Sequence, residues 1–294
     1  MNTIHNTRAD MEIVPLASAL GADVIGLDLS RPLSEAQREQ LTQAWQKHLV
    51  LRIRDQHLEP EDLIAFSRHF GELERHDSYL PEVRHPQHPE VLRIKSTNVK
   101  GEQVVFGQQW HADLTYSLHP ARGACLYCLR LPPVGGDTLF ANMYLAYETL
   151  SPGMRAIVDR LEAVHDLTNG HSYRNKTAEQ VADARRRNPP VVQPVVRTHP
   201  HTGRKALFVS EWMCPRFDGM SEDESRGILG YLFDHSTRPE LTYRQTWEVG
   251  DVLLWDNYAT VHMALKDYAS GAPRELLRTS ITGLACGRPA PHPS

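Results

Sequence analysis

Short apolar segments recur along nearly the whole chain and are separated by turn-forming residues or polar stretches. Their length and their content of β-branched and aromatic residues predict β-strands. The predicted strands cover residues 12–16, 22–27, 50–53, 123–131, 138–141, 163–167, 191–198, 206–210, 241–247, 252–256, 261–264 and 277–283. So many short strands bury their apolar faces by packing against one another, which predicts a closed or double-sheet β architecture.

Helical patterns are fewer and lie between the strands. Ser34-Glu35-Ala36-Gln37 matches a capping box and predicts a helix that ends near His48. Other helices are predicted over residues 59–70, 143–150, 152–161 and 222–235. We therefore expect a mainly β fold with flanking helices, of the α+β class. No repeat or linker divides the 294 residues, so a single domain is predicted.

The charge balance excludes several classes of partner. The formal net charge is −4, and no long run of Lys and Arg occurs. Nucleic acid and anionic membrane surfaces are therefore not expected as partners. The sequence also has no basic-then-apolar N-terminal segment and no uncharged apolar run long enough to span a bilayer. These features predict a soluble, cytoplasmic protein.

Two polar stretches predict loops. Residues 71–109 are polar and are interrupted by prolines. Residues 168–190 are polar as well and include three consecutive arginines. A connection as long as 168–190 within a compact domain is more often a lid or a disordered loop than an ordinary link. We interpret it as a lid insertion over the site described next.

The first sign of chemistry is the tripeptide His111-Ala112-Asp113. On a β-strand, residues two apart point to the same face, so His111 and Asp113 could hold one metal ion together. The same spacing of a histidine and an acidic residue also begins at His57 and His88. The spacing alone is therefore a weak signal for a metal site.

A third candidate ligand, His262, lies in an apolar segment shortly after Trp255-Asp256-Asn257. On its own, a histidine in such a segment is usually a core residue. Two histidines and one carboxylate on one face of an ion leave the opposite positions open. This arrangement is typical of non-haem Fe(II) oxygenases.

Together these motifs make the chain resemble the taurine/2-oxoglutarate dioxygenase family, which includes 2,4-dichlorophenoxyacetate dioxygenases and alkylsulfatases. The resemblance extends over about residues 13–283. The motifs that carry it are Gly71-Glu72-Leu73, Trp110-His111-Ala112-Asp113, Gly135-Gly136-Asp137-Thr138-Leu139, Val196-Arg197-Thr198-His199-Pro200 and Trp255-Asp256-Asn257. It implies a double-stranded β-helix, or jelly roll. Such a barrel brings distant residues to neighbouring inner faces, so that His262 can meet His111 and Asp113.

The resemblance also implies the cofactor set. Fe(II) is expected on His111, Asp113 and His262, with 2-oxoglutarate and O2 as co-substrates. Arg274 is expected to bind the far carboxylate of 2-oxoglutarate, because its planar guanidinium forms a two-pronged contact that lysine does not reproduce. Thr138 stands where the family places a threonine that binds the same co-substrate.

The prime substrate is expected to be a small organic anion. Arg278 follows Arg274 by four residues, so on a strand both face the same side and Arg278 could hold the acid group. The resemblance adds His76, Tyr79 and Met213 as substrate contacts. Outside the family, a solvated arginine pair and a solvated loop histidine would be the ordinary interpretations.

The most specific expectation is hydroxylation of a taurine-like alkanesulfonate, with release of sulfite and an aldehyde. Aryloxyalkanoates and alkyl sulfate esters are alternative substrates, since Arg274-Glu275-Leu276-Leu277-Arg278 is closer to the aryloxyacetate members. One pocket side chain shifts discrimination by only ~1–3 kcal/mol, so the pattern does not fix the substrate. Dimers or tetramers are common among the relatives, and a homo-oligomer is expected.

Two other classes of protein remain open. A zinc hydrolase could use the same three ligands, with water in the fourth position. That scheme gives Arg274 and Thr138 no function. A catalytically silent jelly-roll binding protein is the second possibility, because a fold does not determine a function.

Overall fold

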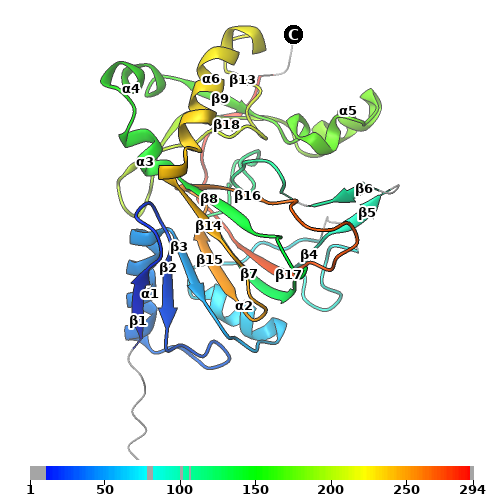
Figure 1. Cartoon of the computed structure of the whole chain (residues 1–294). Helices are drawn as coiled ribbons and strands as arrows, with labels where there is room; N and C mark the ends of the chain where they lie inside the picture. Colours follow the sequence, from blue (N-terminus) through cyan, green and yellow to red (C-terminus); the bar gives the residue numbers. More distant parts are fainter. Residues whose placement is uncertain (1–10, 78–81, 100–101, 106, 292–294) are drawn as a thin grey trace, which may run out of the picture.

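Seven strands form the largest sheet of the computed structural model, which describes residues 11–77, 82–99, 102–105 and 107–291 (Figure 1). We call it the major sheet. In spatial order its strands are β1 (Glu12–Pro15), β2 (Ala22–Ile25), β3 (Val50–Ile53), β15 (Val252–Asp256), β7 (Gly123–Arg130), β17 (Glu275–Ile281) and β4 (Leu92–Lys95). Strands β2 and β3 are parallel, and the other neighbours are antiparallel.

A three-stranded sheet, the minor sheet, consists of β14 (Thr242–Gln245), β8 (Thr138–Asn142) and β16 (Thr260–Ala264) in that order. Smaller sheets join the remaining strands. One contains β13 (Arg216–Phe217), β9 (Glu162–His165), β10 (Val191–Pro194) and β18 (Arg288–Pro289). The others are the pairs β11 (Val196–Thr198) with β12 (Lys205–Leu207), and β5 (Thr97–Val99) with β6 (Glu102–Val104).

The helices lie at the two ends of the molecule. They are α1 (Glu35–His48), α2 (Pro60–Arg68), α3 (Met143–Glu148), α4 (Pro152–Val158), α5 (Ala178–Arg187) and α6 (Glu222–Ser236), with the short 3-10 helices η1 (Leu167–Asn169), η2 (His171–Tyr173) and η3 (Pro239–Leu241). Figure 1 shows α3, α4 and α6 together at the top and α1 and α2 below. Within the described ranges, no helix has the length and apolar character needed to cross a bilayer.

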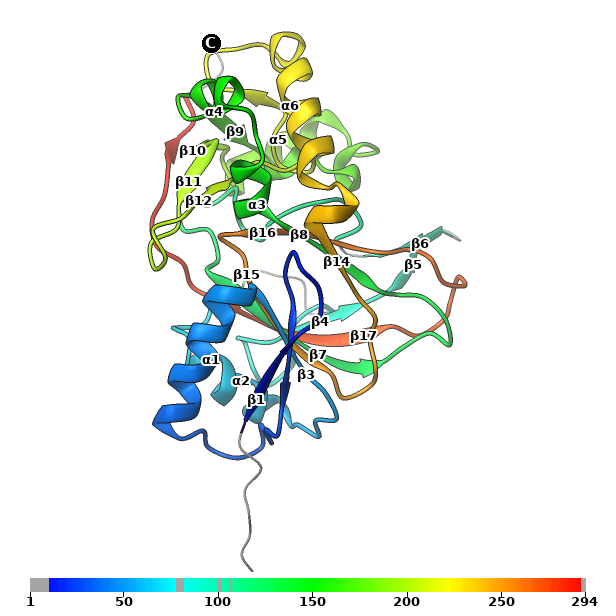
Figure 2. The ribbon, with the colours of Figure 1, turned by 60° about the vertical axis from the view of Figure 1, so that its left-hand side comes forward.

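The centre of the major sheet is buried on both faces. On β15, Val252 and Leu254 pack in one apolar cluster with residues of α1 and α2. Leu253 and Trp255 pack in a second cluster, which contains residues of the minor sheet. This alternation is the period of two that a strand imposes on its side chains. The molecule therefore has three layers: the helices α1 and α2, the major sheet and the minor sheet. Figure 2 shows α1 and α2 on one side of the major sheet.

Most predicted elements are present, and the mainly β class with flanking helices is confirmed. Strands β3 and β15 have the predicted bounds. The first helix begins after the N-cap Ser34, where both hydrogen bonds of the capping box with Gln37 form.

The prediction of a loop over residues 71–109 is wrong for part of that stretch, which contains β4, β5 and β6. Strand β4 is the edge strand of the major sheet and pairs with β17. The Arg93 guanidinium lies 2.6 Å from a carboxylate oxygen of Glu275 on that neighbour. The strand therefore depends on a partner far along the chain, which its own polar sequence does not indicate.

The prediction of a loop over residues 168–190 is wrong for part of the segment, which contains α5. Thr177 is its N-cap and forms a complete capping box with Gln180. The helix buries only Ala184, so it lacks the apolar stripe by which helices are usually recognised. Whether the segment closes over a site stays a prediction.

Gly123 tests the close packing of β7 between its neighbours. A Cβ atom at Gly123 would lie 2.5 Å from the Trp255 carbonyl oxygen and 2.5 Å from Cζ2 of Trp45. We expect Gly123→Ala to lower the free energy of unfolding by about 2–3 kcal/mol through overpacking, as measured by urea denaturation. Gly227→Ala on α6 is the control, because no atom lies within 4 Å of its Cβ position. This variant should gain about 0.5–1 kcal/mol from helix propensity, and equal effects at the two sites would contradict the packing argument.

Candidate metal centre

His111 and His262 face each other across a short stretch of paired backbone. The His111 N–H donates to the His262 carbonyl at 3.0 Å, and the His262 N–H donates to the His111 carbonyl at 2.7 Å. Two residues that exchange both hydrogen bonds lie directly opposite, with their side chains on one face. The two imidazole centroids are 4.2 Å apart. Strand β16 therefore brings together two histidines that are far apart in the sequence.

Asp113 reaches the same place from a turn and not from a strand. The turn includes Leu114, whose φ of 57° ends any extended run. Asn257 holds this turn on both sides of Asp113. The Asn257 Oδ1 accepts from the Asp113 N–H at 2.7 Å, and its Nδ2 donates to the Asp113 carbonyl at 2.8 Å. The prediction of a common strand face is thus wrong, yet His111 and Asp113 do lie together.

The side chains of His111, Asp113 and His262 offer ligand atoms that all lie within 4.8 Å of one another, and all three residues are buried. They form the only such group in the part of the chain that the structure describes. The His111 Nδ1–H donates to the Gln109 carbonyl at 2.8 Å, which leaves the lone pair on Nε2. Asp113 Oδ2 and His262 Nδ1 are buried without a hydrogen-bond partner among the described residues. A divalent metal ion fits this set of donors.

Burial and one neighbouring charge put these groups in the protonation states that a metal requires. Burial lowers the pKa of His262 to about 3 and also lowers the pKa of His111. Burial acts to raise the pKa of Asp113, but the Arg278 guanidinium and the two neighbouring imidazoles together outweigh it, and the net direction is downward. Arg278 Nη1 donates to Asp113 Oδ1 at 3.1 Å. At neutral pH the centre therefore contains two neutral histidines and one carboxylate.

Aromatic rings enclose the two histidines. The Trp212 ring lies 4.6 Å from the His111 ring, measured between centroids. Trp255 of β15 lies 5.0 Å from the His262 ring, and Phe140 stacks on His262 at 5.7 Å. These contacts restrict the rotation of both imidazoles.

The two residues predicted for 2-oxoglutarate also lie together. Arg274 Nε donates to the Gly136 carbonyl at 2.9 Å, and its Nη2 lies 3.5 Å from Thr138 Oγ1. Arg274 is 5% exposed, and burial lowers its pKa. No carboxylate among the described residues forms an ion pair with it. The nearby carboxylates of Asp137 and Asp267 are bound instead by Arg244, at 2.7 and 2.9 Å.

The predicted substrate contacts have different surroundings. His76 is buried, and burial together with the neighbouring Arg278 charge lowers its pKa to about 4. His76 thus lies within electrostatic range of Arg278 and Asp113. Met213 is buried in the apolar core. Tyr79 lies outside the described residues, and the substrate contacts of all four residues stay predictions.

The sequence analysis assigned no function to His199 and Asp256, which form a buried hydrogen-bonded pair near the metal centre. His199 Nε2–H donates to Asp256 Oδ2 at 3.0 Å, and both residues are buried. The His199 Nδ1 accepts from the backbone N–H groups of His201 and Thr202, each at 3.2 Å, which places the proton on Nε2. This pair fixes the backbone directly before Asn257. The only indication of this supporting role in the sequence is that Asp256 directly precedes Asn257 in the Trp255-Asp256-Asn257 motif.

Residues 168–190 contact the metal centre by two routes. The His171 N–H donates to Gln109 Oε1 at 2.8 Å, and the carbonyl of that glutamine accepts from His111. Gly170 lies against Trp212, since a Cβ there would come within 1.8 Å of the Trp212 Nε1. The segment is thus packed onto both neighbours of the His111 ring.

Comparison with known proteins agrees with this geometry. Residues 12–280 match the family model described as "Taurine catabolism dioxygenase TauD, TfdA family". The chain belongs to this TauD, TfdA family. It is a 2-oxoglutarate-dependent non-haem iron dioxygenase, and its family uses Fe(II), 2-oxoglutarate and O2. This assignment removes the zinc-hydrolase alternative, and the complete set of donors argues against a silent binding protein.

Individual relatives within the TauD, TfdA family cover nearly the whole chain. The chain is 35% identical over 260 residues to (S)-phenoxypropionate/alpha-ketoglutarate-dioxygenase of Sphingobium herbicidovorans, covering 86% of this chain and 88% of that protein. It is 32% identical over 284 residues to alpha-ketoglutarate-dependent sulfate ester dioxygenase of Pseudomonas putida, covering 93% and 90%. The crystal structure of AAD-2 with Mn(II) and N-oxalylglycine superposes with a TM-score of 0.84 at 27% identity, covering 94% and 99%.

Replacement of Asn257 tests its support of Asp113. Asn257→Ala leaves the Asp113 N–H and carbonyl without their partner, so the carboxylate loses its fixed position. We expect the affinity for Mn(II), measured by anaerobic titration, to fall about 10- to 100-fold. Asn142→Ala is the matched control, because this buried asparagine caps α3 by accepting from Tyr144 and Leu145. The control should lose stability and keep its metal affinity; equal metal affinities in both variants would refute the supporting role.

Gly170→Ala tests the contact between residues 168–190 and the metal centre. The added methyl group overlaps Trp212 and displaces its ring, which packs against His111. We expect Mn(II) affinity to fall about tenfold, within the usual range for groups that orient a ligand. Gly153→Ala serves as the control, because nothing lies within 4 Å of its Cβ position. Parental affinity in Gly170→Ala would show that the contact does not reach the metal.

Proposed function

We propose that His111, Asp113 and His262 hold Fe(II) and that the enzyme hydroxylates a small aryloxyalkanoate-like anion. The observation that carries the substrate class is a buried positive charge at the metal centre. Arg278 is 4% exposed and donates to the candidate metal ligand Asp113. A guanidinium kept this far from water stabilises an acid group placed beside it.

Arg274 and Thr138 are proposed to bind the far carboxylate of 2-oxoglutarate. A buried guanidinium without a counter-ion is costly, and Arg274 forms no ion pair with any described carboxylate. Arg244 helps to keep Arg274 unpaired, because it binds the nearby carboxylates of Asp137 and Asp267. Thr138 Oγ1 already accepts from Trp247 Nε1 at 3.1 Å, which orients its hydroxyl proton elsewhere, toward a ligand.

Two features favour an organic acid with an apolar tail. The Trp212 ring lies next to His111, and neutral His76 adds no second positive charge. One relative acts, by its name, on phenoxypropionate and another on sulfate esters. The alkanesulfonate predicted from the sequence is a competing outcome of the test below. Arg278 would position the acid group, and the rings would exclude water around the carbon to be hydroxylated.

When bound, Fe(II) supplies the activation of O2 while 2-oxoglutarate is oxidised to succinate and CO2. One oxygen atom enters succinate and the other enters the substrate C–H bond. Hydroxylation at the carbon that bears an ether oxygen gives a hemiacetal or hemiketal. This product breaks down to a phenol and an oxo acid.

The proposal also covers the fold, the segment 168–190 and the assembly of the protein. The major and minor sheets, which pack face to face, are the two halves of a double-stranded β-helix. Residues 168–190 act as a lid, supported by their contacts with Gln109 and Trp212. The single-domain organisation, the cytoplasmic location and the homo-oligomeric assembly stay predictions.

A substrate panel tests the proposed function directly. Succinate formation would be measured with Fe(II), ascorbate and 2-oxoglutarate in the presence of phenoxypropionate, an alkyl sulfate, taurine or an uncharged phenyl ether. We expect the aryloxyalkanoate to give the largest substrate-dependent rate. A larger rate with taurine would restore the alkanesulfonate assignment, and stimulation by an uncharged phenyl ether alone would contradict the role of Arg278.

Arg274→Lys tests the co-substrate site. Lysine keeps the charge but loses the two-pronged contact, which is worth about 1.5–3 kcal/mol for a charged hydrogen bond. The concentration of 2-oxoglutarate for half-maximal rate should rise about 10- to 100-fold. The control is Arg244→Lys, in which the charge beside Asp137 and Asp267 is retained. An unchanged requirement for 2-oxoglutarate in Arg274→Lys would remove Arg274 from the site.

A further inference from the structure

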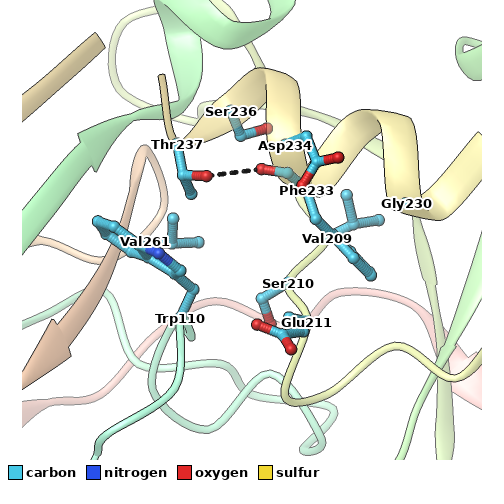
Figure 3. A pocket seen from close by; sticks show the side chains of 10 residues that line it. All are labelled: Trp110, Val209, Ser210, Glu211, Gly230, Phe233, Asp234, Ser236, Thr237 and Val261. Atoms are coloured by element: carbon cyan, nitrogen blue, oxygen red, sulfur yellow. Dashed lines mark hydrogen bonds between the residues drawn. The ribbon is translucent and has the colours of Figure 1, made fainter. Parts of the chain in front are cut away.

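A cavity lies close to the metal centre. Its volume is about 360 Å³. It is lined by Trp110, Val209, Ser210, Glu211, Gly230, Phe233, Asp234, Ser236, Thr237 and Val261 (Figure 3). None of the three metal-binding residues is among these. Trp110 and Val261 directly precede His111 and His262, and side chains alternate along paired backbone. The cavity therefore opens on the opposite side of β16, away from the metal.

The lining combines apolar walls with two acidic groups. Trp110, Val209 and Val261 form apolar surface, and Figure 3 shows Asp234 and Glu211 on different sides of the hollow between them. Both acidic residues are exposed at the rim, and neither forms an ion pair within the described part of the chain. No lysine, arginine or histidine lines the cavity. Its electrostatic potential therefore favours a cation.

A buried hydroxyl provides an independent sign of a ligand. Ser210 is 4% exposed, and its Oγ has no hydrogen-bond partner among the described residues. By contrast, the Thr237 hydroxyl on the same cavity donates to the Phe233 carbonyl at 2.9 Å. A buried polar atom left without a partner costs about 1–3 kcal/mol, so a donor supplied by a ligand would stabilise this site.

We propose that this cavity binds a small organic ammonium ion with an apolar body. The ammonium group donates to Ser210 and faces the carboxylates of Glu211 and Asp234. The body lies against the Trp110 ring, where an adjacent cation gains further attraction from the ring face. A bare metal ion fits less well, because neither acidic residue belongs to a group of three ligating side chains. The site is independent of the catalytic substrate, which is an anion on the other side of β16.

Calorimetric titration of the Mn(II)- and 2-oxoglutarate-loaded enzyme with phenethylammonium tests the proposal. The neutral analogue 2-phenylethanol has the same body without the charge. We expect saturable binding of phenethylammonium that is several-fold tighter than binding of the alcohol. Equal affinities for the two compounds, or no saturable binding of phenethylammonium at millimolar concentration, would overturn the site.

Three variants locate the site. Glu211→Gln and Asp234→Asn should each weaken phenethylammonium binding about two- to five-fold, the range expected for exposed charge pairs. Glu240→Gln changes an exposed carboxylate that does not line the cavity, and it should leave binding unchanged. Binding that is insensitive to both acidic variants, or equally sensitive to the control, would place the ligand elsewhere.

Ser210→Ala gives a test that does not depend on charge. Its hydroxyl has no partner in the free protein, so this variant should unfold at the same temperature as the parent or a higher one. It should nevertheless bind phenethylammonium several-fold more weakly. Unchanged phenethylammonium affinity in Ser210→Ala would remove the hydroxyl from the site.

Discussion

Two backbone hydrogen bonds between His111 and His262 are the contact on which the active centre depends. His262 belongs to β16, which pairs with β8 in the minor sheet. His111 belongs to no long strand and is aligned by this pair, with one further bond from the Ala264 N–H to the Gly107 carbonyl at 2.8 Å. The two imidazoles share a face because their backbones are opposite each other. Any shift of register by one residue would turn one of them away.

The charged groups around this pair leave one metal position and one carboxylate position unfilled. Arg278 binds one oxygen of Asp113 and leaves Oδ2 for a metal. Arg244 binds the acidic residues near Arg274, which leaves that guanidinium for a carboxylate ligand. Burial lowers the pKa of the histidines, so that protons do not compete with a metal at neutral pH. The site thus combines an anionic metal position with a cationic ligand position inside one apolar interior.

Much of the fold could be predicted from the sequence because central strands such as β3, β7 and β15 are buried on both faces and form apolar runs. Strand β4 and helix α5 were missed because each depends on information that apolar periodicity does not carry. For β4 it is an ion pair with Glu275, and for α5 it is a capping box at Thr177. Asp113 was assigned to a strand because leucine rarely adopts a positive φ, so the sequence does not indicate the turn at Leu114.

The three candidate metal ligands and Arg274 were recognised from the family resemblance, whereas the residues that hold them in place were not. Asn257 acts on a turn 144 residues earlier in the chain, a contact that only the folded structure brings about. Gln109 and Trp212 contact His111 directly, and residues 168–190, which stand out in the sequence only as polar, pack against both of them. Supporting contacts of this kind depend on tertiary geometry, and a single sequence has no local pattern for them.

The central claim is that His111, Asp113 and His262 bind one iron next to 2-oxoglutarate. Anaerobic titration of the 2-oxoglutarate-saturated protein with Fe(II), followed by visible absorption, tests it most directly. We predict a charge-transfer band that saturates at one Fe(II) per chain and disappears in Asp113→Ala, with circular dichroism confirming that the metal-free variant is folded at the temperature of the titration. A protein that gives no band, or an Asp113→Ala variant with an undiminished band, would contradict the assignment.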